Sequence, residues 1–409
     1  MLDLTKIARQ MQGISEHLSR EAEQSRQRLE VAQKLRKKAH AEQEHLIQER
    51  EIWRDRMGFP VAIPAEPLDF TPYIPTPPNV QTVLATDGSQ IAPSHHEIAY
   101  CYLINVGRVI LHYGQSRLPL LDSLPEVFYK PEDLYISRQW GIKTEEWMGY
   151  RRGVSEAIAL ADLAIALRTP GSGQIAHPEA PILGMVDGAL IYWFLEPLPT
   201  DARQLILGAI LEAWEKMRQV KVPIVGYISA SRSSESLSFL RLAACPHPHP
   251  DCFSHCPIQA DSVLRPYDQK APCQVFDPLR DTTLWASVLE PGQRSPLWRS
   301  CSRILDLYPP EHQVYFCYLH VGPEIARIDM PAWVAQDPSL LGMALSMVLS
   351  QVQKGYGYPV VLAEAHNQAV VRGGDRARFF ALLEQQMIKA GLQNVGTSYK
   401  ETRKRGSIA

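Results

Sequence analysis

The stretch VLATDGS, residues 83–89, decides how this sequence is expected to fold. Its first three residues are apolar and predict a short buried strand that runs into Asp87 and Gly88. A carboxylate at the end of a buried strand costs free energy unless a partner compensates its charge. The glycine after it permits a sharp turn and a close approach of a ligand or of another backbone segment. We therefore treat Asp87 as the first candidate functional residue.

The same pattern returns at residues 182–188, where the apolar run ILGMV leads into Asp187 and Gly188. If the two strands lie side by side, the carboxylates of Asp87 and Asp187 come close together. Like charges at such a distance require a cation, and Mg²⁺ or Mn²⁺ with oxygen ligands is the usual solution in proteins. The alternative is that each Asp-Gly pair is a simple turn, and the sequence leaves both interpretations open.

Apolar strands alternate with longer helical patterns around these two motifs. The periodicity predicts further strands at residues 98–104, 108–113, 222–228, 314–320, 325–330 and 358–362, and helices at 144–168, 201–219, 338–354 and 374–390. This alternation predicts an α/β fold with a mixed sheet flanked by helices. Residues 83–395 are expected to form this main domain.

The first 56 residues contain no proline and predict a long helical arm. Steps of three and four residues, the heptad spacing of a helix with an apolar seam, separate Leu4, Ile7, Met11, Ile14 and Leu18. The seam then weakens, so a coiled coil, a helical hairpin and an amphipathic arm that packs on its own domain all stay open. Residues 57–82 are rich in proline and predict an extended linker, and residues 396–409 predict a basic tail.

The composition limits the kind of protein. Of 409 residues, 45% are hydrophobic and 21% are charged, so the chain can bury a large core and does not have the composition of a disordered protein. The formal net charge of −2 lacks the positive excess usual in nucleic-acid binders, so contact with DNA would need a local basic patch or metal ions. No apolar run reaches the roughly 18 residues of a membrane span, and no signal peptide is recognisable at the start. We therefore expect a cytoplasmic protein.

Two further residues could complete a metal site with the aspartates. Glu156 lies in the predicted helix at 144–168, although a solvated helical glutamate is the simpler interpretation. His366 follows the predicted strand at 358–362, where imidazole could bind metal, donate a proton or be merely structural. Together with Asp87 and Asp187, they suit phosphodiester hydrolysis by two divalent ions about 4 Å apart.

A segment rich in Pro, Cys and His interrupts the domain at residues 245–300 and looks inserted. Its cysteines Cys245, Cys252, Cys256 and Cys273 could supply four thiolates to structural Zn²⁺ or to an iron–sulfur cluster. The seven cysteines of the chain fit reduced thiols or a metal site better than a disulfide framework. Their spacing matches no standard zinc knuckle, so a proline-rich loop with incidental cysteines is the alternative.

Between about residues 83 and 390 the sequence resembles the NurA nuclease family. The resemblance is carried by the order of LATDGSQ, RRGVSEAIALADLAIAL, ILGMVDGALIYWFLE, VGYISASRSSESLSFLR and YPVVLAEAHNQAVV. It implies an RNase H-like core and a Mn²⁺-dependent DNA nuclease, generally a homodimer that encloses a channel for DNA. It also implies a HerA-type hexameric ATPase as the partner in DNA end processing.

Carried over by position, the resemblance implies a catalytic site that binds two Mn²⁺ or Mg²⁺ ions through Asp87, Glu156, Asp187 and His366. Glu145 and Glu146 begin the same predicted helix as Glu156 and are the alternatives to it.

Two arginines are candidates for phosphate contacts because guanidinium groups suit phosphate oxygens. Arg232 lies in the Ser-Arg-Ser segment after a predicted strand, and Arg151 precedes Glu156. A plain exposed loop and an ordinary helix surface are the alternatives for these two positions.

Two other functions stay open. The chain could be a non-catalytic scaffold that grips DNA beside the ATPase, which its near-neutral charge favours. It could also be an RNase H-like nuclease for RNA or a hybrid, since recognition of a 2′-hydroxyl leaves no short motif.

Overall fold

The computed structural model describes residues 3–11, 13–93, 100–169, 180–256 and 270–391. The chain forms two compact units, each built from two separate stretches of sequence. Unit 1 comprises Met1–Ile74 and Tyr227–Ala335, and unit 2 comprises Pro75–Gly226 and Gln336–Ala409. The predicted basic tail, residues 396–409, lies outside the described residues.

Unit 2 is built on a mixed sheet. Strands β2 (Gln81–Ile91), β3 (Tyr102–Tyr113) and β4 (Leu120–Phe128) form an antiparallel meander, and β5 (Ile182–Asp187) runs parallel to β2. The strand order is β6-β5-β2-β3-β4, and β6 (Ile224–Ile228) contains the boundary between the units. The predicted mixed α/β arrangement is confirmed for this unit.

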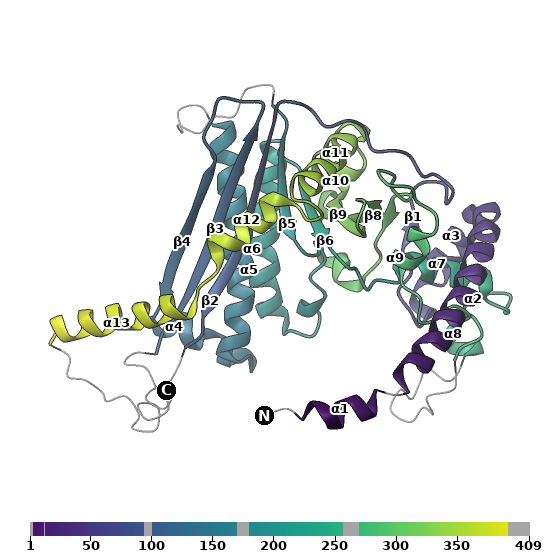
Figure 1. Ribbon diagram of the computed structural model, residues 1–409, viewed down its shortest axis with the longest axis horizontal. Helices are drawn as coiled ribbons and strands as arrows, with labels where there is room; N and C mark the ends of the chain where they lie inside the picture. Colours follow the sequence, from purple (N-terminus) through teal and green to yellow (C-terminus); the bar gives the residue numbers. More distant parts are fainter. Residues whose placement is uncertain (1–2, 12, 94–99, 170–179, 257–269, 392–409) are drawn as a thin grey trace. The chain divides into compact units, whose positions relative to one another are not determined.

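Helices cover both faces of this sheet (Figure 1). On one face, α5 (Thr144–Arg168) contacts β2 and β3 and packs against α6 (Thr200–Gln219). On the other face, α12 (Val360–Ala369) crosses β2 and β3. The remaining helices of unit 2 are α4 (Pro131–Tyr135), α11 (Pro338–Lys354), α13 (Gly373–Lys389), η2 (Ile136–Trp140) and η3 (Trp193–Leu195).

Three predictions about local structure were wrong. Residues 358–362 are not a strand, because α12 begins at Val360 after Pro359 and buries residues at helical spacing. Residues 102–104 and 108–113 belong to a single strand, since β3 runs unbroken from Tyr102 to Tyr113, and residues 98 and 99 of the first predicted strand lie outside the described residues. The strand through Asp87 does not end there, because pairing with β3 carries β2 on to Ile91.

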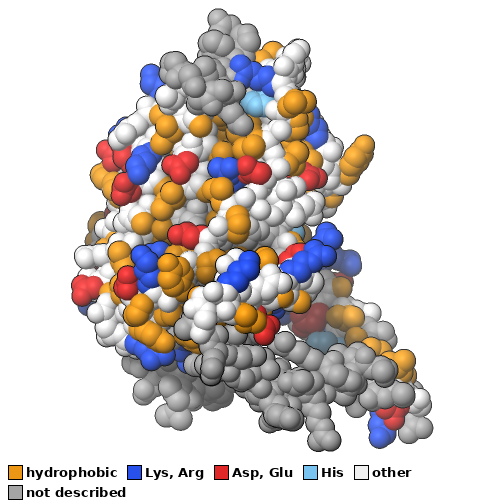
Figure 2. Space-filling view, turned by 90° about the vertical axis from the view of Figure 1, so that its left-hand side faces the viewer, with side chains coloured by type: hydrophobic (Ala, Val, Ile, Leu, Met, Phe, Trp, Pro, Cys, Tyr) orange, Lys and Arg blue, Asp and Glu red, His pale blue; other side chains and the backbone are white. Residues whose placement is uncertain are grey.

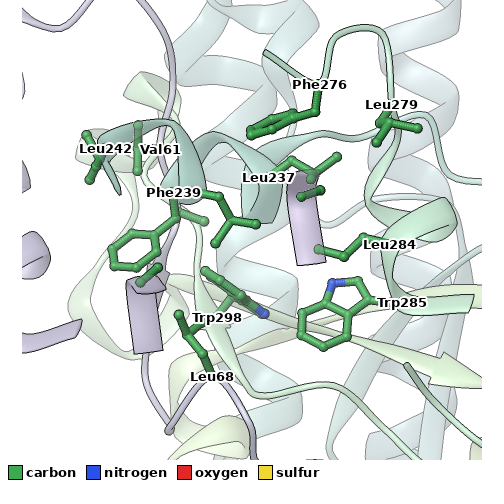
Figure 3. Close-up of a cluster of buried hydrophobic side chains, with 14 of the residues drawn as sticks. Val61, Leu68, Leu237, Phe239, Leu242, Phe276, Leu279, Leu284, Trp285 and Trp298 are labelled. Carbon is green, nitrogen blue, oxygen red and sulfur yellow. The ribbon is translucent and has the colours of Figure 1, made fainter. Parts of the chain in front are cut away.

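Unit 1 contains four short strands in the order β1-β7-β8-β9. Their bounds are β1 (Ile63–Pro64), β7 (Trp298–Arg299), β8 (Val314–His320) and β9 (Ile325–Pro331). The helices around them are α7 (Glu235–Ala244), α8 (Cys252–His255), α9 (Asp281–Ala286), α10 (Ala332–Ala335), η1 (Arg54–Arg56), η5 (Arg303–Leu307) and η6 (Pro310–His312). Phe239, Trp285 and Trp298 meet in the apolar core of this unit (Figure 3).

The N-terminal arm is helical, as predicted, and consists of α1 (Leu4–Gln10), α2 (Ile14–Ala41) and α3 (Gln43–Ile52). Its C-terminal part packs on the core of unit 1 through Ala32, Ala39 and Leu46. Its first part exposes most of the heptad residues, and the coiled coil stays a prediction. None of the described helices is long and apolar enough to cross a membrane.

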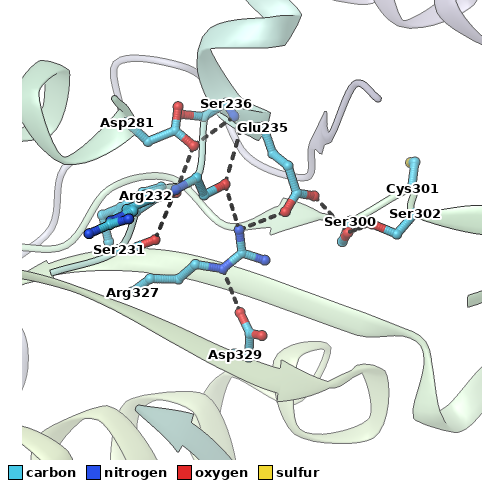
Figure 4. Close-up of polar contacts among 12 residues, drawn as sticks. Ser231, Arg232, Glu235, Ser236, Asp281, Ser300, Cys301, Ser302, Arg327 and Asp329 are labelled. Atoms are coloured by element: carbon cyan, nitrogen blue, oxygen red, sulfur yellow. Dashed lines mark hydrogen bonds and ion pairs between the residues drawn. The ribbon is translucent and has the colours of Figure 1, made fainter. Parts of the chain in front are cut away.

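A buried ionic network fixes the loop that carries Arg232 (Figure 4). The guanidinium of Arg327 is 2.7 Å from carboxylate oxygens of both Glu235 and Asp329, and it donates to the hydroxyl of Ser233. The two carboxylates raise the pKa of Arg327 against the opposing effect of burial. Because Ser233 is tied down, the neighbouring Arg232 side chain extends from an anchored backbone into solvent.

We expect Gly107→Ala to lower the free energy of unfolding by about 1–3 kcal/mol, as overpacking commonly does. A methyl group there would lie 2.5 Å from the backbone oxygen of Ala365, which cannot move without shifting α12. The matched control is Gly208→Ala, an exposed position in α6 with no atom within 4 Å, where alanine should stabilise by about 0.5–1 kcal/mol. Urea unfolding measures both, and a Gly107→Ala variant as stable as the parent would contradict the packing of α12 on β3.

Candidate active site

Asp87 lies in the middle of β2, and its side chain is on the face covered by α12. One carboxylate oxygen accepts a hydrogen bond from the backbone N–H of Gly88 at 2.8 Å. The other lies 2.8 Å from Nδ1 of His366, which extends from α12 and is largely exposed. The imidazole therefore lies beside the carboxylate, within reach of solvent.

Asp187 is the last residue of β5, the strand parallel to β2. Ala85 pairs with Met185, so the two aspartates lie two residues beyond this pair, on the same face of adjacent strands. Burial raises the pKa of Asp187, a hydrogen bond with Tyr358 lowers it, and the charge of Asp87 raises it again. The aspartates thus share one site, as their sequence pattern predicts.

Glu156 reaches this site from α5, on the opposite face of the sheet. It comes in beside Gly88, where a Cβ atom would lie 2.3 Å from Oε1 of Glu156, so a larger residue at this position would force the Glu156 side chain to shift. Burial raises the pKa of Glu156 to about 7; Arg152, at 3.2 Å, lowers it, and the charges of Asp87 and Asp187 raise it. Burial is therefore the main cause of the raised pKa of Glu156, and the charges of the two aspartates add to it.

The structure therefore brings together all four side chains that the sequence singled out. Carboxylate and imidazole are ligand types that Mg²⁺ and Mn²⁺ accept in proteins. Within the described part of the chain, no group of three or more His, Cys, Asp or Glu side chains is already spaced to hold a metal ion. Arg152 and His366 here contact the oxygens of Glu156 and Asp87 that a cation would take.

The phosphate contacts predicted for the arginines stay predictions. Arg151 lies over the ring of Phe128, whereas its neighbour Arg152 contacts Glu156. Arg232 belongs to unit 1 and is exposed. On the face drawn in Figure 2, basic and acidic side chains are interspersed, in keeping with the near-neutral net charge.

Sequence reasoning missed two parts of the site. Tyr358 hydrogen-bonds Asp187, and no spacing rule connects residues so far apart. The aromatic run Tyr192-Trp193-Phe194 lines a cavity together with Glu156 and Asp187, although in the sequence it looks like ordinary core. The sequence feature that could have indicated its role is its position, a few residues after the second Asp-Gly motif.

The four cysteines of the predicted structural metal site lie around one pocket of unit 1. Its lining includes Cys245, Cys252, Cys256 and Cys273. Arg241 donates a hydrogen bond to the sulfur of Cys273 at 3.4 Å. Because the described side chains are not spaced to hold an ion there, the metal stays a prediction.

The sequence matches the model of the NurA domain family over residues 81–371. The chain belongs to the NurA family. The matched segment contains Asp87, Glu156, Asp187 and His366, so the whole candidate site of this NurA protein lies within the family domain.

Two other comparisons complete the picture of this NurA protein. No curated protein matches its sequence. Among solved structures, its fold is similar to the NurA nuclease from Sulfolobus solfataricus, with a TM-score of 0.47 and 15% sequence identity over 95% of this chain and 98% of that chain.

We expect Glu156→Gln to raise the free energy of unfolding at pH 8 by about 1–3 kcal/mol in the presence of a chelator. The folded-state pKa of Glu156, about 7, exceeds the ordinary value of 4.5, so ionisation costs stability as pH rises between these values. The gain should therefore be nearly absent at pH 4.5 and complete above pH 7. Urea unfolding at both pH values measures it, with the exposed Glu384→Gln as control. A gain in the free energy of unfolding that is the same at both pH values would contradict the raised pKa of Glu156.

Proposed function

We propose that this protein is a metal-dependent DNA nuclease that hydrolyses phosphodiester bonds at the site formed by Asp87, Glu156, Asp187 and His366. The observation that carries the proposal is that Asp87 and Asp187 lie on the same face of adjacent strands, with Glu156 within electrostatic range of both. Burial raises the pKa values of Glu156 and Asp187, and the charge of Asp87 adds to the rise in both, so bound cations would stabilise the ionised carboxylates. Membership of the NurA family supports the same reading.

Asp87, Glu156 and Asp187 would hold two Mn²⁺ or Mg²⁺ ions. When bound, such ions activate a water molecule and stabilise the charge on the leaving oxygen. The N–H of Gly88 orients Asp87, and Tyr358 orients Asp187, so both carboxylates are fixed before a ligand arrives. In the reaction the water loses a proton to the solvent as its oxygen bonds to phosphorus, and the bond from phosphorus to the leaving sugar oxygen breaks.

His366 would supply the proton that the leaving oxygen needs. Its imidazole extends from α12 beside Asp87 and is 66% exposed, so it would lie within reach of both the site and the solvent. Arg152 would move from Glu156 towards a phosphate oxygen once a cation takes its place.

The family also suggests the setting of this activity. We propose a homodimer that works on DNA ends with a HerA-type hexameric ATPase, within an RNase H-like core. Two alternative functions stay open, a non-catalytic scaffold and an RNase H-like nuclease that acts on RNA or a hybrid.

Binding of DNA without cleavage in any divalent metal would favour the scaffold. Equal cleavage of matched RNA, DNA and hybrid strands would favour an RNase H-like enzyme of broader substrate range.

The decisive experiment compares Asp87→Asn and Asp187→Asn with the parent on single- and double-stranded DNA in Mn²⁺. Each substitution removes a ligand charge, so we expect kcat to fall at least about 100-fold, the order seen when an electrostatic catalytic group is lost. The control is Asp162→Asn, an exposed position in α5, which should cut like the parent. Asp187→Asn should melt no lower than the parent above about pH 4, because the raised pKa of Asp187 shows that its neutral form is favoured in the folded state, and the melting temperature of Asp87→Asn checks that this variant is folded. Undiminished cleavage by both would reject the assignment.

We also propose a structural metal at the cysteine pocket. Purified protein should contain about one zinc ion or about four iron atoms per chain, measured by mass spectrometry of the elements together with the absorption spectrum. Cys252→Ser and Cys273→Ser should lose that metal, whereas Cys301→Ser, outside the pocket, should keep it. Metal-free parent protein prepared without chelators would end this proposal.

A further inference from the structure

Beside the carboxylates, unit 2 contains a cavity of about 260 Å³ with two unlike walls. One wall is acidic and includes Glu156 and Asp187, two of the proposed metal ligands. Another part of the lining is aromatic and consists of Tyr192, Trp193, Phe194 and Trp214. A ligand in this cavity would therefore contact an aromatic surface, and the groups covalently attached to that ligand would lie at the proposed metal site.

The aromatic wall is held in place by ring contacts. Phe194 stacks on Tyr150 with ring centroids 5.6 Å apart and planes 3° apart, and it meets the ring of Tyr192 edge to face. Tyr192 in turn lies against Trp214 at 6.0 Å. Despite these contacts, 51% of the surface of Phe194 and 42% of that of Trp193 stays exposed. Rigid aromatic rings that remain accessible are the surface on which single-stranded nucleic acids stack their bases.

The charge and the volume of the cavity indicate which part of a nucleotide, its phosphate, sugar or base, could bind there. Its lining contains no lysine or arginine in the part of the chain that the structure describes, so away from the proposed cations no basic side chain of the lining is present to neutralise a phosphate. Its volume lies slightly below the roughly 300–1,000 Å³ of pockets for drug-sized ligands, which suits one small ring system. A neutral, planar, aromatic group satisfies these conditions, and in DNA that group is the base.

We propose that this cavity binds the base of a nucleotide next to the scissile phosphate, stacked on Phe194 and Trp193 and withdrawn from its neighbours in the strand. The inference rests on the proposed function, since the metal site places the phosphate. A base can enter only after it leaves a duplex stack, so the preferred substrate is a single strand or a frayed end.

An abasic scan tests the inference. Single-stranded oligonucleotides carry one abasic nucleotide at successive positions, and kcat/KM is measured for each linkage in Mn²⁺ with the parent, Phe194→Ala, Trp193→Ala and Phe194→Trp. Tyr129→Ala removes an exposed aromatic side chain that does not line the cavity and is the matched control. Melting temperatures check that each variant is folded.

With the parent and with Tyr129→Ala, linkages beside the abasic nucleotide should be cut at least about fivefold more slowly than the same linkages in an intact strand, the lower end of what one stacked base contributes. The Phe194→Ala and Trp193→Ala variants should cut intact strands as slowly as the parent cuts linkages beside an abasic nucleotide. Removing a base from the strand should not slow these variants further. Phe194→Trp should keep the penalty, because the indole still stacks. An abasic penalty as large in the alanine variants as in the parent would overturn the proposal.

A binding measurement separates this inference from the nuclease proposal. Strands that contain 2-aminopurine, whose fluorescence falls on stacking, are titrated with Asp87→Asn and with the Asp87→Asn, Phe194→Ala double variant. Quenching that depends on Phe194 supports a base pocket even if the parent cuts no substrate. Equal quenching by both proteins, or none, overturns it whatever the cleavage assay gives.

Discussion

Burial of carboxylates near one another is the constraint on which the candidate site of unit 2 depends, because burial, together with the charge of Asp87, raises the pKa of both Glu156 and Asp187. Pairing of β2 with β5 fixes two of these groups side by side, and α5 adds the third from the opposite face. Each receives partial compensation: an N–H and an imidazole for Asp87, a phenol for Asp187, a guanidinium for Glu156. Burial, with a smaller contribution from the two aspartates, still raises the pKa of Glu156 to about 7. Under the proposed function, bound cations would offset this cost.

Two glycines let helices approach the sheet closely enough to complete this site. Gly88 leaves room for Glu156 on one face, and Gly107 leaves room for the backbone of α12 on the other. The close contact at Gly107 positions α12, and α12 carries His366 to Asp87. Side chains that project from strands and helices are held more precisely than side chains on loops, which suits a reaction that depends on alignment.

Much of the site could be predicted from sequence because its signals are local. The helix at 144–168 has the predicted bounds, and two apolar runs that each lead into Asp-Gly do bring their carboxylates together. The errors come from short segments. The apolar run at residues 358–362 fits a strand as well as a helix, because it is too short for its periodicity to distinguish them. In the structure, Pro359 comes directly before the first turn of α12. Thr-Asp-Gly-Ser looks like a turn, yet β3 supplies ladder partners that keep β2 extended. Contacts such as Tyr358 with Asp187 depend on tertiary structure and leave no pattern in the sequence.

The near-neutral net charge of the chain bears on how DNA would be attracted to this site. Proteins that bind DNA through many lysines and arginines gain affinity from phosphate neutralisation wherever the strand lies. Here the candidate site is acidic, and the face drawn in Figure 2 mixes both signs of charge. Under the proposed function, attraction for phosphate would arise at the bound cations, and the aromatic wall beside Glu156 would add affinity that does not depend on charge. Binding would then be strongest where a phosphate meets the metal and its base meets Phe194, so the reacting linkage and the recognised nucleotide would coincide.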